Sequence, residues 1–144
     1  MNFTIRAATK VDCKDISRMI MELALFEKMT DQVKISSEEL ERDGFCPNPL
    51  FECLVAEVPK ENKSKQGFTT VGYGLYFYTY STWKGRSMHL EDLYVMPEFR
   101  GGQREALCSL AIKRFGLERP FTRLLRCSRS SGSHHQGRLA LNTF

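Results

Sequence analysis

The most informative segment of the chain is Ser87-Met-His-Leu-Glu-Asp-Leu-Tyr-Val-Met-Pro-Glu-Phe-Arg-Gly-Gly102. Its apolar positions include Leu90, Leu93, Val95 and Met96. They predict a strand over residues 86–96, with two acids, Glu91 and Asp92, in its middle. We expect Pro97 to end the strand, because proline has no N–H for the next ladder bond and fixes its own backbone angle.

A tight turn and a helix are predicted after this strand. Arg100-Gly101-Gly102 supplies the turn, and residues 103–115 have helical spacing of their apolar side chains. A glycine turn between a strand and a helix can bind an anion, since its free N–H groups and the positive helix end favour a phosphate. The turn is therefore a candidate phosphate site.

The motif resembles the central motif of the GNAT acyltransferases, which reads roughly L-x-V-x-P-x-x-R-G-x-G-x-G/A. The matching positions here are Leu93, Val95, Pro97, Arg100 and Gly101. Tyr80-Ser-Thr-Trp-Lys-Gly-Arg86 and the acidic pair narrow the resemblance to the diamine acetyltransferases. Within the spermidine/spermine N1-acetyltransferase branch, the chain is more similar to the thialysine-acetylating members. The resemblance covers residues 3–101.

The order of predicted elements agrees with this resemblance. We expect a strand, two helices, three antiparallel strands and a helix, at residues 3–7, 12–28, 36–44, 51–58, 69–80, 86–96 and 103–115. This order predicts an α/β fold, and the resemblance implies that it is the N-terminal half of a GNAT domain. We expect the domain to occupy residues 1–118 and to be incomplete on its C-terminal side. Residues 119–144 form a basic, Arg/Ser-rich tail that we expect to be poorly ordered, because it has little apolar surface to bury.

Composition narrows the class of protein. The chain has 144 residues, 42% hydrophobic and 26% charged, as in a single globular domain. It has no apolar run near the roughly 20 residues that span a bilayer and no apolar signal core at its start, so we expect a cytoplasmic location and no membrane contact. Its five cysteines include no Cys-x-x-Cys pair, which predicts neither a disulfide framework nor a metal site.

Charge is distributed unevenly along the chain. Residues 1–99 hold 12 Lys/Arg and 15 Asp/Glu, whereas residues 100–144 hold 9 Lys/Arg and 2 Asp/Glu. A basic tail can bind nucleic acid, but this tail has almost no interleaved aromatic residues on which bases could stack. We therefore do not expect nucleic acid as a partner.

The resemblance implies acetyl transfer from acetyl-CoA, as cosubstrate, to a primary amine of a polyamine or small diamine. Such an amine is mostly protonated at neutral pH and must lose a proton before it attacks. We predict that Glu91 is the catalytic residue that accepts this proton and that Glu91 and Asp92 bind the cationic substrate. Because neighbouring residues of a strand point to opposite faces, we expect only one of the two acids to face the site, and the other could be an ordinary solvent-facing acid.

Phe26 and Glu27, at the end of the first helix, match an aromatic–glutamate pair that contacts substrate in the family. The resemblance therefore implies that both are substrate-binding residues. A carboxylate at this position could hold the far ammonium group of a diamine. The alternative is an ordinary solvated helix end.

The resemblance also implies the residues that bind acetyl-CoA. The backbone groups of Leu93, Tyr94 and Val95 would contact the pantetheine arm, and one N–H would polarise the thioester carbonyl. Arg100, Gly101 and Gly102 would hold the pyrophosphate. The alternative for the first three is a plain core strand.

The chain departs from the family pattern after residue 102. Gln103 and Glu105 replace two glycines of the phosphate loop, and no tyrosine follows Tyr94 to protonate the leaving thiolate. A complete copy of such an enzyme is expected to be a homodimer. The alternative function is a catalytically impaired variant that acts as an interaction module or is an unstable subunit.

Overall fold

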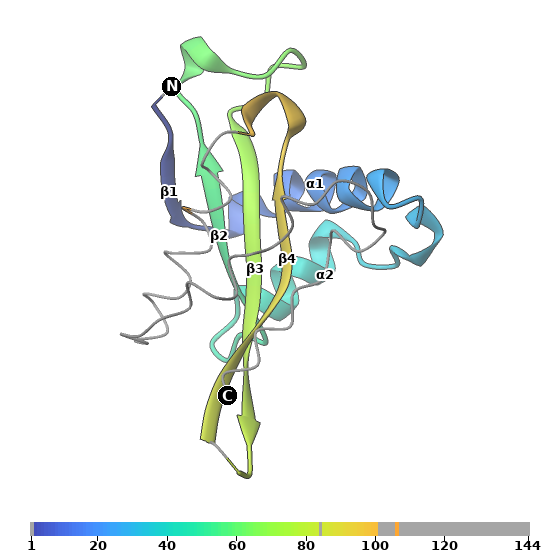
Figure 1. The fold of residues 1–144 in the computed structure, drawn as a ribbon, viewed down its shortest axis with the longest axis vertical. Coiled ribbons are helices and arrows are strands. Elements are labelled where there is room, and N and C mark those ends of the chain that lie inside the picture. The colour runs from blue at the N-terminus through green and yellow to red at the C-terminus, as the bar shows by residue number, and fades with distance from the viewer. Residues whose placement is uncertain (1, 84, 101–105, 107–144) are drawn as a thin grey trace.

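A computed structural model of the chain describes residues 2–83, 85–100 and 106 (Figure 1). Gly101, Gly102 and the tail over residues 119–144 lie outside the described part. Of the helix predicted over residues 103–115, only Ala106 is described, and it is helical.

The described elements form one antiparallel sheet of four strands in the order β1-β2-β3-β4. The strands are β1 (Thr4–Ala7), β2 (Glu52–Glu57), β3 (Thr70–Ser81) and β4 (Gly85–Val95), and the helices are α1 (Cys13–Phe26) and α2 (Ser37–Gly44). Four 3-10 turns complete the list, namely η1 (Lys10–Asp12), η2 (Thr30–Gln32), η3 (Lys60–Asn62) and η4 (Pro97–Phe99). The predicted order of one strand, two helices and three antiparallel strands is confirmed. Pro97 follows β4 as expected.

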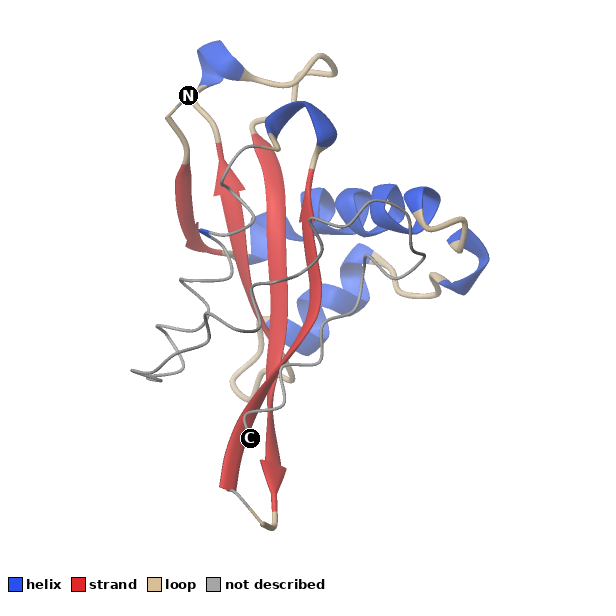
Figure 2. Cartoon of the chain, in the orientation of Figure 1, coloured by secondary structure: helices blue, strands red, loops and turns tan. Residues whose placement is uncertain are grey.

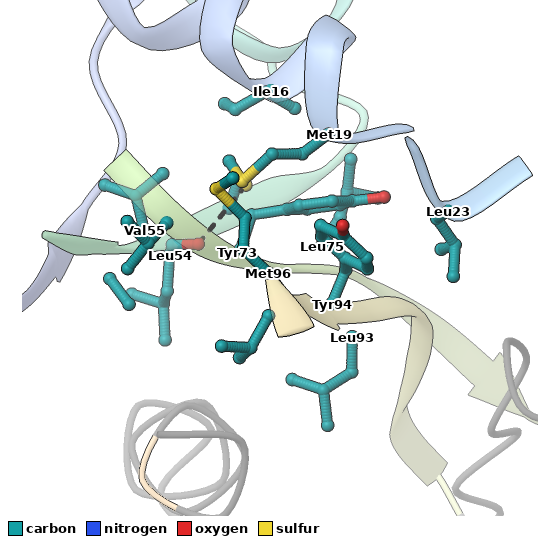
Figure 3. Packing of buried hydrophobic residues seen from close by; sticks show 14 of the residues in the cluster. Ile16, Met19, Leu23, Leu54, Val55, Tyr73, Leu75, Leu93, Tyr94 and Met96 are labelled. Carbon is teal, nitrogen blue, oxygen red and sulfur yellow. Dashed lines mark hydrogen bonds between the residues drawn. The ribbon is translucent and has the colours of Figure 1, made fainter. Parts of the chain in front are cut away.

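Both helices lie on the same side of the sheet (Figure 2). The apolar stripe of α1 faces the sheet, and Figure 3 shows Ile16 and Met19 next to Tyr73 of β3. Tyr73 and Met19 are fully buried. Burial of this stripe against the sheet holds α1 across β3 and β4.

Local contacts fix the start of α2 and the end of α1. Ser36 and Glu39 form a capping box at the start of α2, with Glu39 N–H donating to Ser36 Oγ (3.2 Å) and Ser36 N–H donating to Glu39 Oε2 (2.8 Å). At the end of α1, Lys28 adopts a left-handed conformation (φ 58°), and Met29 N–H donates to the carbonyl of Ala24 (2.9 Å). This cap directs the chain away immediately after Phe26.

The hairpin of β3 and β4 extends beyond the other strands as a two-stranded ribbon (Figure 1). β2 pairs with β3 only as far as Tyr76, so among the described strands residues 77–81 pair with β4 alone. Three aromatic side chains of the ribbon are exposed, namely Tyr78, Tyr80 and Trp83. Within the part of the chain that the structure describes, no helix is long and apolar enough to cross a membrane.

Candidate active site

β4 contains a β-bulge at Glu91. Leu75 of β3 lies opposite Asp92, and the next residue, Tyr76, lies opposite Leu90. Glu91 is therefore an extra residue on β4 with no position opposite it on β3. A bulge of this kind interrupts the alternation of side chains between the two faces of a sheet.

Asp92 lies on the face of the sheet that is covered by α1. The hydroxyl of Tyr73 donates a hydrogen bond to Asp92 Oδ2 (3.0 Å), and Tyr73 has no exposed surface. Burial, and then the charge of Asp92, raises the pKa of the Tyr73 hydroxyl well above its ordinary value of 10.0. The hydroxyl therefore stays protonated and fixes the orientation of the carboxylate.

Glu91 points to the same face. Its Oε2 atom lies 3.0 Å from Nε2 of His89, and the His89 ring lies 4.9 Å from the ring of Phe77 (centroid to centroid). Phe77 and Tyr73 are four residues apart on a regular strand, so they share one face. The expectation that Glu91 and Asp92 point to opposite faces is therefore wrong, because the bulge breaks the alternation between them.

Leu93 and Val95 direct their backbone groups away from β3. The N–H of Met96 donates to the carbonyl of Val71 (2.8 Å), so this pair is hydrogen-bonded. Hydrogen-bonded pairs alternate along an antiparallel ladder, so Tyr94 also bonds to β3, while Leu93 and Val95 do not. Within the described residues, no strand pairs with this outer edge of β4.

The predicted cofactor residues thus divide into two groups. Leu93 and Val95 offer N–H and C=O groups at the outer edge, whereas those of Tyr94 are used within the sheet. The side chain of Arg100 reaches this edge, where its Nε donates to the carbonyl of Val95 (3.0 Å). Gly72 makes room on the other side of β4, since a Cβ atom there would lie 3.0 Å from the carbonyl oxygen of Tyr94.

Tyr94 instead uses its side chain to connect β4 to α1. Its hydroxyl donates to Glu22 Oε2 (2.9 Å), and burial followed by the Glu22 bond raises the pKa of Tyr94 to about 12. Arg18 donates to Glu22 Oε1 (2.9 Å) and to the carbonyl of Thr70 (2.8 Å). These bonds fix the position of the central part of β4 relative to α1 and β3.

Phe26, the last residue of α1, and Arg100, which follows the η4 turn, lie close together. Phe26 is 56% exposed at the end of α1, and the Cζ atom of Arg100 lies 5.7 Å from the centre of its ring. A guanidinium group at this distance attracts the face of the ring. Glu27 is partly exposed at the same helix end. The predicted substrate-binding helix end therefore borders the predicted phosphate turn.

The sequence did not reveal the side-chain partners of Glu91, Asp92 and Tyr94, which are His89, Tyr73 and Glu22. His89 precedes Glu91 by two residues in a strand, and this spacing alone places two side chains on one face. Tyr73 and Glu22 carried no comparable signal, since their bonds join elements that are distant in sequence. Among the described residues, no group of three or more His, Cys, Asp or Glu could hold a metal ion.

The comparisons with known sequences match about two thirds of the chain. No family model matches the chain. The chain is 59% identical over 97 residues to the mouse protein named thialysine N-epsilon-acetyltransferase, a match that covers 67% of this chain and 57% of the mouse protein. It is 46% identical over 99 residues to human spermidine/spermine N(1)-acetyltransferase-like protein 1, covering 69% of this chain and 14% of that protein. The chain thus spans little more than half the length of the mouse relative.

A comparison with solved structures shows that the fold is similar to that of an N-acetyltransferase. The ribosomal-protein-alanine N-acetyltransferase from Brucella melitensis biovar Abortus 2308 matches with a TM-score of 0.53 at 16% identity. The match covers 80% of this chain and 72% of that one. At this level of identity the likeness concerns the fold alone.

Proposed function

We propose that this chain, which has the GNAT acetyltransferase fold and resembles the thialysine N-epsilon-acetyltransferases over two thirds of its residues, is an acetyl-CoA-dependent N-acetyltransferase. Its acceptor is the primary amine of a small diamine or polyamine, such as thialysine or a spermidine-like molecule. The observation that carries the proposal is the bulge in β4, which directs Glu91 and Asp92 to one face beside the outer backbone edge of Leu93 and Val95. The names of the relatives support the reaction class.

Two neighbouring carboxylates on one face favour a cationic substrate. Asp92 is held by Tyr73, and Glu91 is paired with His89 at a partly exposed position. An ammonium group gains from both charges, whereas an acidic acceptor would be repelled. Phe26 and Glu27 at the end of α1 would contact the rest of the substrate.

The reaction requires removal of a proton from the ammonium group. Glu91 is the group that accepts it, directly or through a water molecule, because its carboxylate lies on the face where the amine would bind. Acetyl-CoA supplies the acetyl group when bound. An outer N–H group of Leu93 or Val95 would stabilise the negative charge that develops on the carbonyl oxygen.

The same edge would bind the cofactor. Arg100, Gly101 and Gly102 would hold the pyrophosphate, and the described one of them, Arg100, is already bonded to Val95. Gln103 and Glu105 depart from the family loop, which predicts weaker binding of acetyl-CoA, since Glu105 would repel phosphate. The resemblance to the diamine acetyltransferases supports a cytoplasmic homodimer as part of this proposal.

A second candidate function is a catalytically impaired interaction module. The observation that favours it is the absence of any tyrosine after Tyr94, where the family has its general acid. In this case the chain would pair with another subunit and would not turn over an amine.

Two measurements on the same purified sample separate these functions. The first is acetyl-CoA binding by calorimetry, and the second is acetylation of thialysine or spermidine. Binding with turnover supports the enzyme. A folded sample that binds no acetyl-CoA and acetylates neither amine contradicts it and supports the interaction module.

A further inference from the structure

His89 is the partner of the acid that we propose as the proton acceptor. The two side chains meet at 3.0 Å (His89 Nε2 to Glu91 Oε2), and their exposed fractions are 26% and 33%. When Glu91 is ionised, it can only accept a hydrogen bond, so the hydrogen between the two atoms belongs to Nε2 of His89. The imidazole therefore orients the carboxylate in both of its charge states.

We propose that His89 is a positioning residue for Glu91 and sets the pH range in which this site binds a cationic amine. The inference rests on the proposed function, since it concerns the same amine site. It adds a group that acts through Glu91 without contacting the substrate.

The effect follows from the charge of the imidazole. Histidine changes its charge between about pH 5 and pH 8. When His89 is neutral, Nε2–H still donates to Glu91, and the carboxylate keeps its full negative charge for the ammonium group. When His89 is protonated, the pair is neutral overall, and the incoming ammonium group meets a second cation close to its binding partner. Binding should therefore strengthen as pH rises.

The surroundings of His89 leave Glu91 as its close charged partner in the described part of the site. The neighbouring side chain on β3 is the apolar ring of Phe77. Farther along the same face of β4 lies Asp92, bonded to Tyr73. Arg86 lies over the ring of Tyr78, on the opposite face of the ribbon. None of the ion pairs described for α1 or α2 includes His89.

The test measures spermidine binding to the full chain by calorimetry at about pH 5.5 and about pH 7.5. Spermidine amino groups, like other alkyl amines with pKa values near 10, stay largely protonated over this range. The wild type is compared with His89→Gln, whose amide can still donate to Glu91 but never carries a charge. His89→Phe removes both the donor and the charge. Glu52→Gln is the matched control, because Glu52 accepts a bond from Tyr76 on the other face of the sheet.

We expect the wild type to bind spermidine about fivefold more weakly at the lower pH, as for a charge change a few ångströms from the ligand. His89→Gln should bind equally at both pH values, at the affinity of the wild type at the higher pH. His89→Phe should also lose the pH dependence but bind about threefold more weakly. Glu52→Gln should behave as the wild type does.

Two results overturn the inference, and they differ. If His89→Gln and His89→Phe keep the pH dependence of the wild type, or the wild type has none, His89 does not act through Glu91, although the proposed function stands. If spermidine binds to no variant at either pH, the amine site itself is wrong, and the proposed function fails together with the inference. Histidines elsewhere, including His134 and His135, are present in every variant and cannot produce a difference between them.

Discussion

The hydroxyl of Tyr73 in β3 donates a hydrogen bond of 3.0 Å to the carboxylate of Asp92 in the neighbouring strand β4. Tyr73 is fully buried, whereas Asp92 is partly exposed. The hydroxyl of a core residue, Tyr73, therefore orients the carboxylate of Asp92 in the proposed site. Packing of α1 against Tyr73 and the geometry of the site depend on the same side chain.

Replacement of Tyr73 by phenylalanine tests this dependence. Tyr73→Phe keeps the buried ring but removes the donor, so we expect a loss of about 1 kcal/mol in the free energy of unfolding. Spermidine should bind about threefold more weakly, because Asp92 is no longer oriented. Urea unfolding and calorimetry on the same sample measure the two effects.

The control for this variant is Tyr76→Phe. Tyr76 is equally buried and donates to Glu52 (2.7 Å) on the opposite face of β3. It should lose a similar stability without any change in spermidine affinity. An equal loss of affinity in both variants would mean that the effect of Tyr73 comes from general loosening of the sheet.

Glu91 should matter for the reaction much more than for the fold. Its side chain is partly exposed at a bulge, so Glu91→Gln should change stability by less than about 0.5 kcal/mol. If Glu91 accepts the proton of the amine, the rate of acetylation should fall by roughly 100-fold or more. Steady-state kinetics with thialysine measure this rate, and Glu61→Gln in the exposed η3 turn is the control. A rate within a few-fold of the wild type would remove Glu91 from the role of base.

The sequence predicted the elements well because their signals are local. Ser36 and Glu39 have the spacing of a capping box, and the box is present at the start of α2. Pro97 lies just after β4, as expected for a residue that has no N–H to donate to a strand ladder. Each of these features is decided by one residue and its immediate neighbours.

The site was less predictable because it depends on pairing between strands. The bulge at Glu91 is visible only when β4 is aligned with β3, so a period of two placed the acids on opposite faces. The partners of Asp92 and Tyr94 lie 19 and 72 residues away. Such contacts leave no pattern within a short window of sequence.

Gly72 should be needed for the position of the outer edge of β4. In Gly72→Ala the new Cβ atom would lie 3.0 Å from the carbonyl oxygen of Tyr94 and 3.1 Å from Val95 Cγ2, so β4 must shift. We expect a loss of about 1–3 kcal/mol in stability and a weaker affinity for acetyl-CoA. Chemical unfolding and calorimetry measure these two quantities.

Gly67→Ala provides the comparison for this variant. Gly67 has a φ of 92°, which an alanine adopts only with strain, but a Cβ atom there would have no neighbour within 4 Å. The variant should lose about 1 kcal/mol of stability and keep the acetyl-CoA affinity of the wild type. If both glycine variants lose affinity equally, the edge of β4 is not the cause.

The bond between Tyr94 and Glu22 should be lost at alkaline pH. The pKa of Tyr94 is raised from 10.0 to about 12 in the folded protein, so its contribution to stability is complete below about pH 10 and decreases as pH rises toward 12. Tyr94→Phe should be about 1 kcal/mol less stable than the wild type at pH 8, and the difference should narrow above pH 10. Urea unfolding at several pH values measures it, and a difference that stays constant up to pH 12 would contradict the assignment.

The contribution of Asp12 to the free energy of unfolding should have the opposite pH dependence, because it is lost as pH falls. Burial acts to raise its pKa, but bonds from the Arg6 guanidinium (2.7 and 2.9 Å) and from Thr9 N–H (2.7 Å) outweigh burial and lower the pKa below 3.8. A carboxyl group with a lowered pKa stabilises the fold above its unfolded value, and this contribution is lost as pH falls below about 4. Asp12→Asn should therefore cost about 2–3 kcal/mol at pH 7, since Arg6 loses a charged partner at the junction of β1 and α1.

Urea unfolding at pH 7 and at about pH 3 tests this prediction. The difference between the wild type and Asp12→Asn should shrink at the lower pH, because the wild-type carboxyl group begins to be protonated there. Asp31→Asn, at an exposed position in η2, should have little effect at either pH. A difference for Asp12→Asn that is as large at pH 3 as at pH 7 would mean that its cost comes from packing. The charge of Asp12 would then not be what joins β1 to the start of α1.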